Sequence, residues 1–240
     1  MTILSVNINK IATLRNARGG NMPDVEKAAA DIEGFGAEGI TVHPRPDGRH
    51  IKYEDVRLLK KLIRTEFNIE GNPEPSFRDL VMEVVPEQVT LVPDGHDAIT
   101  SNCGWDTIKH EAFLTEMCNL FYSKGIRVSI FIDPLPEMAY GAARCGADRI
   151  ELYTAAYAEN YPLDREAAVA PYLRTAQAAR EARLGVNAGH DLNLDNLEYL
   201  LKTIPWIDEV SIGHALICDA LYLGLEKTVH EYLIRTHVNK

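Results

Sequence analysis

The sequence is poor in cysteine and has no long apolar run. Its four cysteines (Cys103, Cys118, Cys145 and Cys218) are widely spaced and form no C-x-x-C pair, so they indicate neither a zinc site nor a disulfide framework. No segment approaches the length of a transmembrane helix, and MTILSVNI at the start lacks the pattern of a signal peptide. We therefore expect a cytoplasmic protein with reduced thiols and no membrane partner.

Positive charge is also scarce, with 25 Lys and Arg against 35 Asp and Glu and a net charge of −10 at pH 7. This balance argues against nucleic acid or an anionic membrane as a partner. Against that background, the stretch GITVHPRPDGRHI at residues 39–51 carries two histidines and two arginines on a proline-stiffened loop. A basic cluster in an acidic chain predicts a small anionic ligand.

A dinucleotide fingerprint is absent as well, because NKIATLRNARGG rather than G-x-G-x-x-G follows the first predicted strand. This disfavours a doubly wound open sheet. Eight alternations of a β-branched run with an amphipathic segment instead predict a single (β/α)8 TIM barrel over residues 1–240, rather than two small domains. The predicted strands are Ile3–Ile8, Gly39–Val42, Phe67–Glu70, Gln88–Val92, Arg127–Ile132, Arg149–Leu152, Gly185–Asn187 and Glu209–Ile212. The predicted helices lie near 24–35, 53–66, 76–85, 107–124, 135–144, 164–182, 193–203 and 214–235.

Helix boundaries have their own signals. Asp24 and Asp164 stand where helix N-caps are expected, since a short acidic side chain accepts hydrogen bonds from the first free N–H groups. Glycines predict the helix ends because glycine adopts the left-handed conformation of a C-terminal cap. These glycines are Gly36, Gly125, Gly146 and Gly185.

Polar side chains end nearly every predicted strand, which is where the working groups of such a barrel lie. They are Asn7 and Asn9, His43, Arg45, Arg49 and His50, Glu70 and Asn72, Thr100, Asp133, Glu151 and Thr154, Asn187 and His190, and Gly213 and His214. Several of them can transfer protons near neutral pH. Because the strand ends of a barrel meet at one rim, the set predicts an active site there.

Single residues of this set also have structural interpretations. Arg45 and Arg49 could be surface arginines that pair with Asp47 or Glu54. Glu70 could cap a helix or pair with an arginine. The sequence leaves these alternatives open.

Glycine-histidine pairs follow the last two predicted strands, in NAGH and in SIGHALI. The second pair leads directly into a predicted helix, whose free N–H groups and dipole favour phosphate. A second anion site follows from Arg45, Arg49 and His50, since a guanidinium group matches phosphate bidentately. Two anion sites around histidines and a glutamate predict two phosphorylated substrates or one bisphosphate.

With these features, the chain resembles the pyridoxine 5′-phosphate synthase family over essentially its whole length. The resemblance rests on the order and spacing of eight segments rather than on any single one. They are VNINKIATLRNARG, GITVHPRPDGRHI, FNIEGN, LVPDGHDAITSNCGWD, VSIFID, RIELYTAAYA, VNAGHDLN and SIGHALI.

The resemblance implies a reaction and a set of roles. 1-Deoxy-D-xylulose 5-phosphate would condense with 3-amino-2-oxopropyl phosphate to give pyridoxine 5′-phosphate, phosphate and water, without a cofactor and in a homo-oligomer such as an octamer. By motif, the proton-transfer residues would be His43, Glu70 and His190, with Glu151 stabilising the transition state. The aminoketone phosphate would be bound by Asn7, Arg18, the backbone near Asp191, and Gly213 with His214. The deoxyxylulose phosphate would be bound by Asn9, Lys10, Arg45, His50 and Thr100.

Two positions depart from the family pattern. Asn9-Lys10 stands where Asp-His is expected, and Asp191 stands where glycine often follows the histidine.

Two other protein classes stay open. A metal-dependent barrel hydrolase usually shows a His-x-His pair after its first strand, which this sequence lacks, and we predict no metal site. A non-catalytic barrel that binds a sugar phosphate would need the anion sites but not Glu70 with both histidines.

Overall fold

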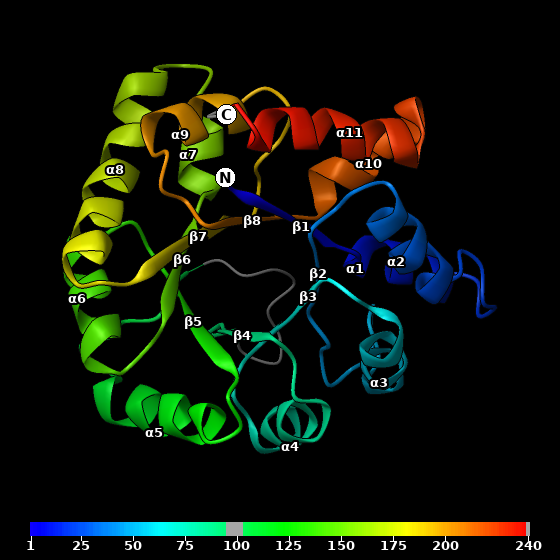
Figure 1. The fold of residues 1–240 in the computed structure, drawn as a ribbon, viewed down its shortest axis with the longest axis horizontal. Helices are drawn as coiled ribbons and strands as arrows, with labels where there is room; N and C mark the ends of the chain where they lie inside the picture. Colours follow the sequence, from blue (N-terminus) through cyan, green and yellow to red (C-terminus); the bar gives the residue numbers. More distant parts are fainter. Residues whose placement is uncertain (95–102, 239–240) are drawn as a thin grey trace.

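The computed structural model describes residues 1–94 and 103–238, and it confirms the predicted (β/α)8 barrel. Eight parallel strands pair in sequence order, and β1 closes the barrel against β8 inside a ring of helices (Figure 1). The strands are β1 (Ile3–Asn7), β2 (Gly39–Val42), β3 (Glu66–Gly71), β4 (Gln88–Leu91), β5 (Arg127–Ile132), β6 (Arg149–Tyr153), β7 (Gly185–Gly189) and β8 (Glu209–Ile212). The helices are α1 (Asn9–Asn16), α2 (Val25–Gly34), α3 (Tyr53–Leu62), α4 (Pro75–Val84), α5 (Glu111–Tyr122), α6 (Pro136–Arg144), α7 (Ala155–Asn160), α8 (Arg165–Glu181), α9 (Leu197–Thr203), α10 (His214–Leu223) and α11 (Leu225–Thr236).

The differences from the predicted elements lie mainly in the connections. Residues that we expected to form a loop after the first strand fold into α1, and α7 is an additional short helix after β6. The predicted helix over 214–235 is two helices, α10 and α11. They are separate because Gly224 takes a φ of 81°, which ends α10.

The predicted helix caps are largely confirmed. Asp24 accepts a hydrogen bond from the backbone N–H of Lys27 at 2.9 Å, and Asp164 caps α8 in the same way. Of the glycines predicted to end helices, Gly36, Gly125 and Gly146 do follow helices with a positive φ. The prediction for Gly185 is wrong: Arg183 takes the left-handed conformation with a φ of 61°, and Gly185 begins β7.

The interior of the barrel is polar, and the hydrophobic core lies outside it. Side chains from different strands hydrogen-bond across the interior, as between Ser5 Oγ and Thr41 Oγ1 at 2.7 Å and from Thr90 Oγ1 to Asn68 Oδ1 at 3.2 Å. Strand residues alternate in direction, so the intervening aliphatic residues face the helices. This outer core includes Leu4, Val6, Ile40, Val42, Ile69, Val89, Leu91, Ile130, Ile150, Leu152, Val210 and Ile212, all essentially buried.

A repeated carboxylate holds the starts of the strands together. An acidic residue stands directly before each even-numbered strand. Its carboxylate accepts a hydrogen bond from the strand that comes before in the sequence, where the donor is the backbone N–H of the second residue. The pairs are Leu4 with Glu38, Phe67 with Glu87, Val128 with Asp148, and Val186 with Asp208, at 2.8–3.3 Å. These bonds satisfy the donors at the amino-terminal face of the barrel. The polar groups at the other face have a different use.

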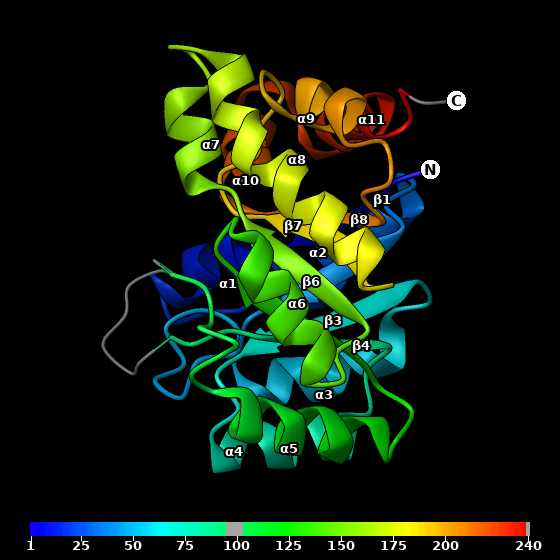
Figure 2. The same ribbon diagram turned by 90° about the vertical axis from the view of Figure 1, so that its left-hand side faces the viewer.

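The two faces of the barrel differ in what they carry. The start of β1 and the end of α11 lie on one side of the barrel, while α1 lies toward the other (Figure 2).

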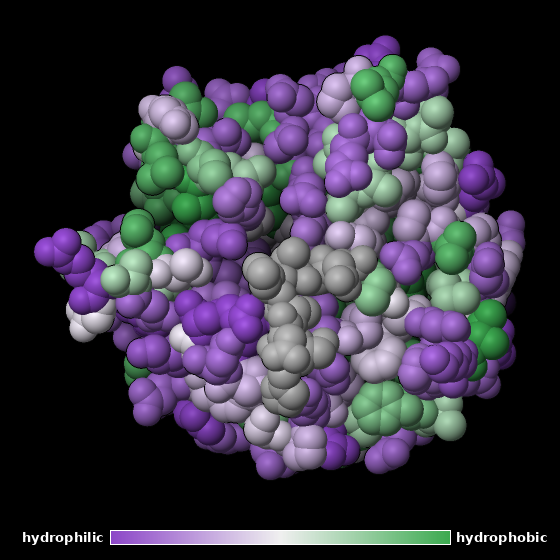
Figure 3. Space-filling view, turned by 180° about the vertical axis from the view of Figure 1, so that it is seen from behind, coloured by the Kyte–Doolittle hydropathy of each residue, from purple (hydrophilic) through white to green (hydrophobic). Residues whose placement is uncertain are grey.

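Seen from behind, the surface is mainly hydrophilic apart from an apolar patch in the region of α10 (Figure 3). Exposed apolar side chains there include Leu221, Tyr222 and Leu223. None of the helices in the described ranges is long and apolar enough to cross a membrane.

Candidate active site

His43 and Glu70 lie side by side at the carboxyl ends of β2 and β3. The His43 imidazole Nδ1 is 3.9 Å from Glu70 Oε2. Asn7, at the end of β1, donates to the same carboxyl oxygen at 3.4 Å, and Ser211 of β8 donates to the other oxygen at 3.4 Å. The barrel thus gathers side chains from four strands around one carboxyl group.

The surroundings shift the pKa values of this pair in opposite directions. Burial, followed by the negative charge of Glu209, raises the pKa of Glu70 to about 8. Burial, followed by the positive charge of Arg45, holds the pKa of His43 well below its usual range. At neutral pH, Glu70 therefore holds a proton while His43 is uncharged, so a proton donor and a proton acceptor are adjacent.

Glu151 lies in the barrel interior near this pair. Thr90 Oγ1 donates to Glu151 Oε2 at 3.3 Å. Burial, followed by the charge of Glu70, raises the pKa of Glu151 well above its ordinary value. A Cβ at Gly189 would lie 2.3 Å from Glu151 Oε1, so only glycine leaves room for this carboxyl group. Glu151 is therefore placed against the residue that precedes His190.

His190 follows β7 in a conformation that non-glycine residues rarely adopt, with a φ of 82°. Its Nδ1 lies 2.8 Å from Asp191 Oδ2, and the edge of its ring packs against Tyr153 with a centroid distance of 5.1 Å. The hydrogen bond with His190 lowers the pKa of Asp191. The extra carboxylate at position 191 is thus turned toward an imidazole.

The predicted aminoketone phosphate residues, except Arg18, lie near one another at the start of α10. Gly213 is the N-cap residue of this helix, and a Cβ added to it would lie 3.1 Å from the Cβ of Asn7. The charge of His214 contributes to the lowered pKa of Asp191, which places these two side chains near each other. Arg18 is exposed beyond the end of α1 and forms no hydrogen bond or ion pair with the other candidates in the described ranges.

Among the predicted deoxyxylulose phosphate residues, Asn9 is part of the framework. Its Oδ1 accepts the backbone N–H of His43 at 2.9 Å, which ties the end of β2 to the start of α1. The ring of His50 lies 6.2 Å from that of His43. Burial, followed by the charges of Arg45 and Lys10, lowers the pKa of His50 to about 4. Thr100 lies outside the described residues.

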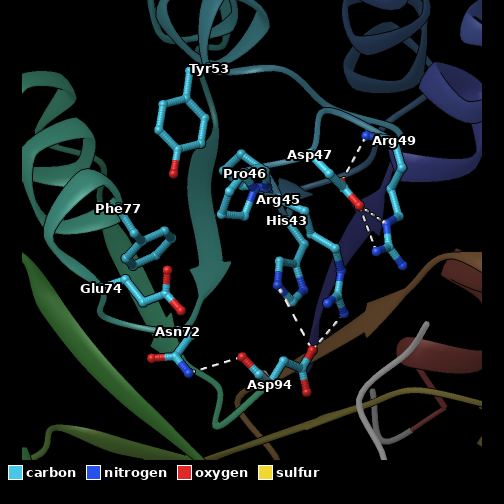
Figure 4. Close-up of a pocket in the computed structure, with 11 residues that line it drawn as sticks. His43, Arg45, Pro46, Asp47, Arg49, Tyr53, Asn72, Glu74, Phe77 and Asp94 are labelled. Atoms are coloured by element: carbon cyan, nitrogen blue, oxygen red, sulfur yellow. Dashed lines mark hydrogen bonds and ion pairs between the residues drawn. The ribbon is translucent and has the colours of Figure 1, made fainter. Parts of the chain in front are cut away.

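A cavity of about 300 Å³ opens beside His43 and Arg45 (Figure 4). Tyr53, Glu74 and Phe77 form its opposite wall. Arg45 is buried here, and its Nη2 lies 2.6 Å from Asp94 Oδ2, so the surface alternative is wrong for this arginine.

Arg49 does follow the surface alternative, because its Nη2 pairs with Asp47 Oδ2 at 2.5 Å on the same loop. The other alternative, that Glu70 pairs with an arginine or caps a helix, does not describe the contacts of Glu70 with Asn7, Ser211 and His43. Within residues 1–94 and 103–238, no group of three or more His, Cys, Asp or Glu side chains is arranged to hold a metal ion.

Sequence reasoning missed three residues that contact the candidates: Thr90, Asp94 and Ser211. Asp94 follows the fourth strand in LVPD, so the strand-end rule could have found it. Thr90 and Ser211 lie inside strands, where the pattern of the sequence does not distinguish them from structural residues. Only the polar interior of this barrel gives them a partner.

The comparisons with known proteins agree over nearly the whole chain. The family model for "Pyridoxal phosphate biosynthesis protein PdxJ" matches residues 4–237. A protein from Cytophaga hutchinsonii, named pyridoxine 5′-phosphate synthase, is 64% identical over 97% of this chain and 98% of its own length. Proteins of the same name from Bacteroides fragilis and Christiangramia forsetii are 64% and 61% identical, each over 97% of this chain and 98% of its own length.

Solved structures resemble the fold alone. 3-Keto-L-gulonate-6-phosphate decarboxylase from Vibrio cholerae matches with a TM-score of 0.66 at 8% identity, over 98% of this chain and 97% of its own. Thiamine phosphate pyrophosphorylase from Pyrococcus furiosus matches with a TM-score of 0.63 at 14% identity, over 98% of this chain and 95% of its own. At such identities the shared feature is the barrel.

The fold is a (β/α)8 barrel with titratable side chains gathered at the carboxyl ends of its strands, and the named relatives make it an enzyme. The family model and the relatives make the assignment more specific. The chain belongs to the PdxJ family of pyridoxal phosphate biosynthesis, whose members named above are pyridoxine 5′-phosphate synthases, enzymes of vitamin B6 biosynthesis.

Proposed function

We propose that this protein condenses 1-deoxy-D-xylulose 5-phosphate with 3-amino-2-oxopropyl phosphate. The products are pyridoxine 5′-phosphate, inorganic phosphate and two molecules of water. The amine of one substrate forms an imine with the ketone of the other, phosphate leaves, and ring closure with dehydration gives the aromatic pyridine. Each of these steps moves a proton on or off carbon, nitrogen or oxygen, so the reaction calls for several acid–base groups.

The observation that carries this proposal is the pair formed by Glu70 and His43. A protonated carboxyl group and an uncharged imidazole, 3.9 Å apart, can give a proton to and take a proton from a substrate that binds against both of them. Glu151 lies between this pair and His190. The His190 imidazole, directly after the end of β7, is a further acid or base. A non-catalytic barrel that binds a phosphate ester would not need a carboxyl group beside His43 together with a second histidine at the end of β7.

Two places in the site suit the phosphate esters. The first is the start of α10, where Gly213 and His214 present backbone N–H groups along the helix axis, with Asn7 packed against them. The second lies around Arg45 and His50. The Nδ1 atom of His50 is buried and has no hydrogen-bond partner among the described residues, so a phosphate oxygen could satisfy it.

The direct test is to mix the purified protein with both phosphorylated substrates and to follow pyridoxine 5′-phosphate by its absorbance. Inorganic phosphate should appear in equal amount, and omission of either substrate should abolish both signals. If the folded protein releases no product from the complete mixture, this proposal is wrong.

We also infer a cytoplasmic homo-oligomer, as the family resemblance implies. The exposed apolar side chains Leu221 and Tyr222 on α10 support a contact between copies, because clustered apolar groups are costly to leave in water. Light scattering after size-exclusion chromatography should give a mass that is a multiple of 26.8 kDa. A monomer at micromolar concentration would contradict the inference.

A further inference from the structure

Asp94 is the most buried acidic side chain beside the cavity, and nothing about the reaction has so far required it. It follows β4, and its side chain is 3% exposed. One carboxylate oxygen, Oδ2, lies 2.6 Å from Arg45 Nη2 and 4.0 Å from His43 Nε2 (Figure 4). The backbone carbonyl of Asp94 accepts a hydrogen bond from Asn72 Nδ2 at 2.9 Å. The backbone of Asp94 is thus held in place by a side chain from the end of β3.

The neighbouring ion pair on the same loop provides the contrast. Arg49 pairs with Asp47, two positions away, and the two side chains are more exposed than the Arg45–Asp94 pair, at 33% and 46%. Such a pair forms locally and contributes little. Arg45 instead takes its partner from another strand, 49 positions along the chain, and both groups are buried. Burying two charges costs desolvation energy that a local surface pair avoids, so stability alone gives little reason for the arrangement.

The position of Asp94 has two consequences for the site. It holds one edge of the Arg45 guanidinium, which fixes the plane in which that group can meet a phosphate. Its charge also faces Nε2 of His43, while Nδ1 of the same ring faces Glu70. A negative charge near Nε2 favours a proton on that nitrogen, which leaves the lone pair of Nδ1 directed toward Glu70. At 4.0 Å this effect is electrostatic rather than a hydrogen bond.

We propose that Asp94 is a positioning residue for the reaction: it holds the Arg45 guanidinium for the phosphate of the sugar substrate and orients the His43 imidazole toward Glu70. This inference rests on the proposed function and assigns a role within it. The same carboxylate also opposes phosphate electrostatically. Removal of this charge should therefore strengthen phosphate binding while it lowers turnover.

The test compares Asp94→Asn with Asp47→Asn, which removes the same charge from the other arginine pair of this loop. In Asp94→Asn, kcat should fall about 10²-fold, within the range for lost acid–base positioning. Inorganic phosphate, titrated by calorimetry, should bind about threefold more tightly because the competing charge is gone. In Asp47→Asn the loss of kcat should be at least tenfold smaller than the loss in Asp94→Asn. Asp94→Glu, which restores the charge, should recover at least tenfold of the lost kcat.

Several results would overturn the proposal. A folded Asp94→Asn variant with kcat within threefold of the wild type would do so. Equal losses of phosphate binding and turnover would show that Asp94 merely supports the loop. If Asp94→Asn does not fold, Asn72→Ser loosens the Asp94 backbone instead and should lower kcat about tenfold; unchanged turnover would again overturn the idea. If the wild type itself makes no product, the proposed function fails, while the phosphate titrations still test the contact between Asp94 and Arg45.

Discussion

Buried carboxyl groups occupy two levels of this barrel, and their partners differ. At the carboxyl ends of the strands, the contacts of Glu70 with the described residues are long, at 3.4 Å to Asn7 and Ser211 and 3.9 Å to His43. At the amino-terminal level, Glu209 Oε2 accepts from Arg149 at 3.0 Å and from Gln88 and Asn187 at 3.1 Å. We call Glu70 and Glu151 the upper carboxyl groups, and Glu209 and Glu66 the lower carboxyl groups.

The difference shows that a buried carboxyl group in this barrel can serve either the structure or the proposed reaction. Burial raises the pKa of Glu209 to about 8, as it does for Glu70, so a raised pKa alone does not mark a catalyst. What separates the two levels is hydrogen bonding. The lower carboxyl group of Glu209 is held by an arginine and two amides. The upper carboxyl group of Glu70 has longer contacts with Asn7, Ser211 and His43, and such weaker contacts are more easily exchanged for hydrogen bonds to a substrate.

The largest expected effect comes from Glu70→Gln. The amide keeps the shape but cannot transfer a proton, so kcat should fall about 10³-fold, which corresponds to about 4 kcal/mol. Phosphate binding and the urea midpoint of unfolding should stay near the wild type. The matched control is Glu209→Gln, in which turnover should fall less than tenfold. Equal losses in the two variants would erase the distinction between the levels.

The next effect concerns stability. Arg149→Met removes the hydrogen bonds that Arg149 donates to Glu209, Asn187 and Gln88 and should lower the free energy of unfolding by about 3 kcal/mol, because these buried acceptors then lose a charged donor. Urea unfolding at pH 7 measures this change, and kcat per folded molecule should stay within threefold. A variant as stable as the wild type would show that the lower network does not hold the barrel together.

The pH dependence of stability follows from both levels. Glu70 and Glu209 have pKa values of about 8 in the folded protein, against an ordinary glutamate value of 4.5 in the unfolded chain, so the folded protein binds more protons between those values. Stability is therefore greatest at the lower pH and falls as pH rises through 8. His43 and His50, with lowered pKa values, weaken the fold only below about pH 6.5.

Between pH 6.5 and 8, the free energy of unfolding should thus fall by about 2 kcal/mol per pH unit at fixed protein concentration. Glu70→Gln and Glu209→Gln should each flatten the slope. Urea curves at half-unit intervals of pH measure it. A stability that rises over this window would mean that neither carboxyl group keeps its proton.

The smallest effect is expected at Asp191, where the upper level departs from the family pattern. Asp191→Asn keeps an acceptor for His190 Nδ1 but removes a negative charge near the start of α10. The KM for 3-amino-2-oxopropyl phosphate should fall about threefold, since the dianion meets less repulsion, with kcat nearly unchanged. Steady-state kinetics at varied aminoketone phosphate decides this, and a raised KM would show that the charge assists binding through His190.

Local patterns in the sequence carried most of the architecture. The period of the strands and helices predicted the barrel, and Asp24 and Asp164 cap the helices as expected, because caps depend on neighbouring residues only. The same reasoning missed α1, and it could not separate α10 from α11 at Gly224. For the site, motif and strand-end position indicated His43, Glu70, Glu151 and His190. The strand-end rule could also have found Asp94, while Thr90 and Ser211 required knowledge of which side chains meet inside the barrel.

The amino-acid order by itself determined that eight strands alternate with helices, and that imidazole, carboxyl and guanidinium groups follow those strands. Only closure of the barrel decided which of these groups meet. It set Glu70 among Asn7, Ser211 and His43, and it gave Arg45 a buried partner 49 positions away. The physical reason is that proton affinity and hydrogen bonding depend on distance and burial in space, and a linear order of residues contains neither until the chain is packed.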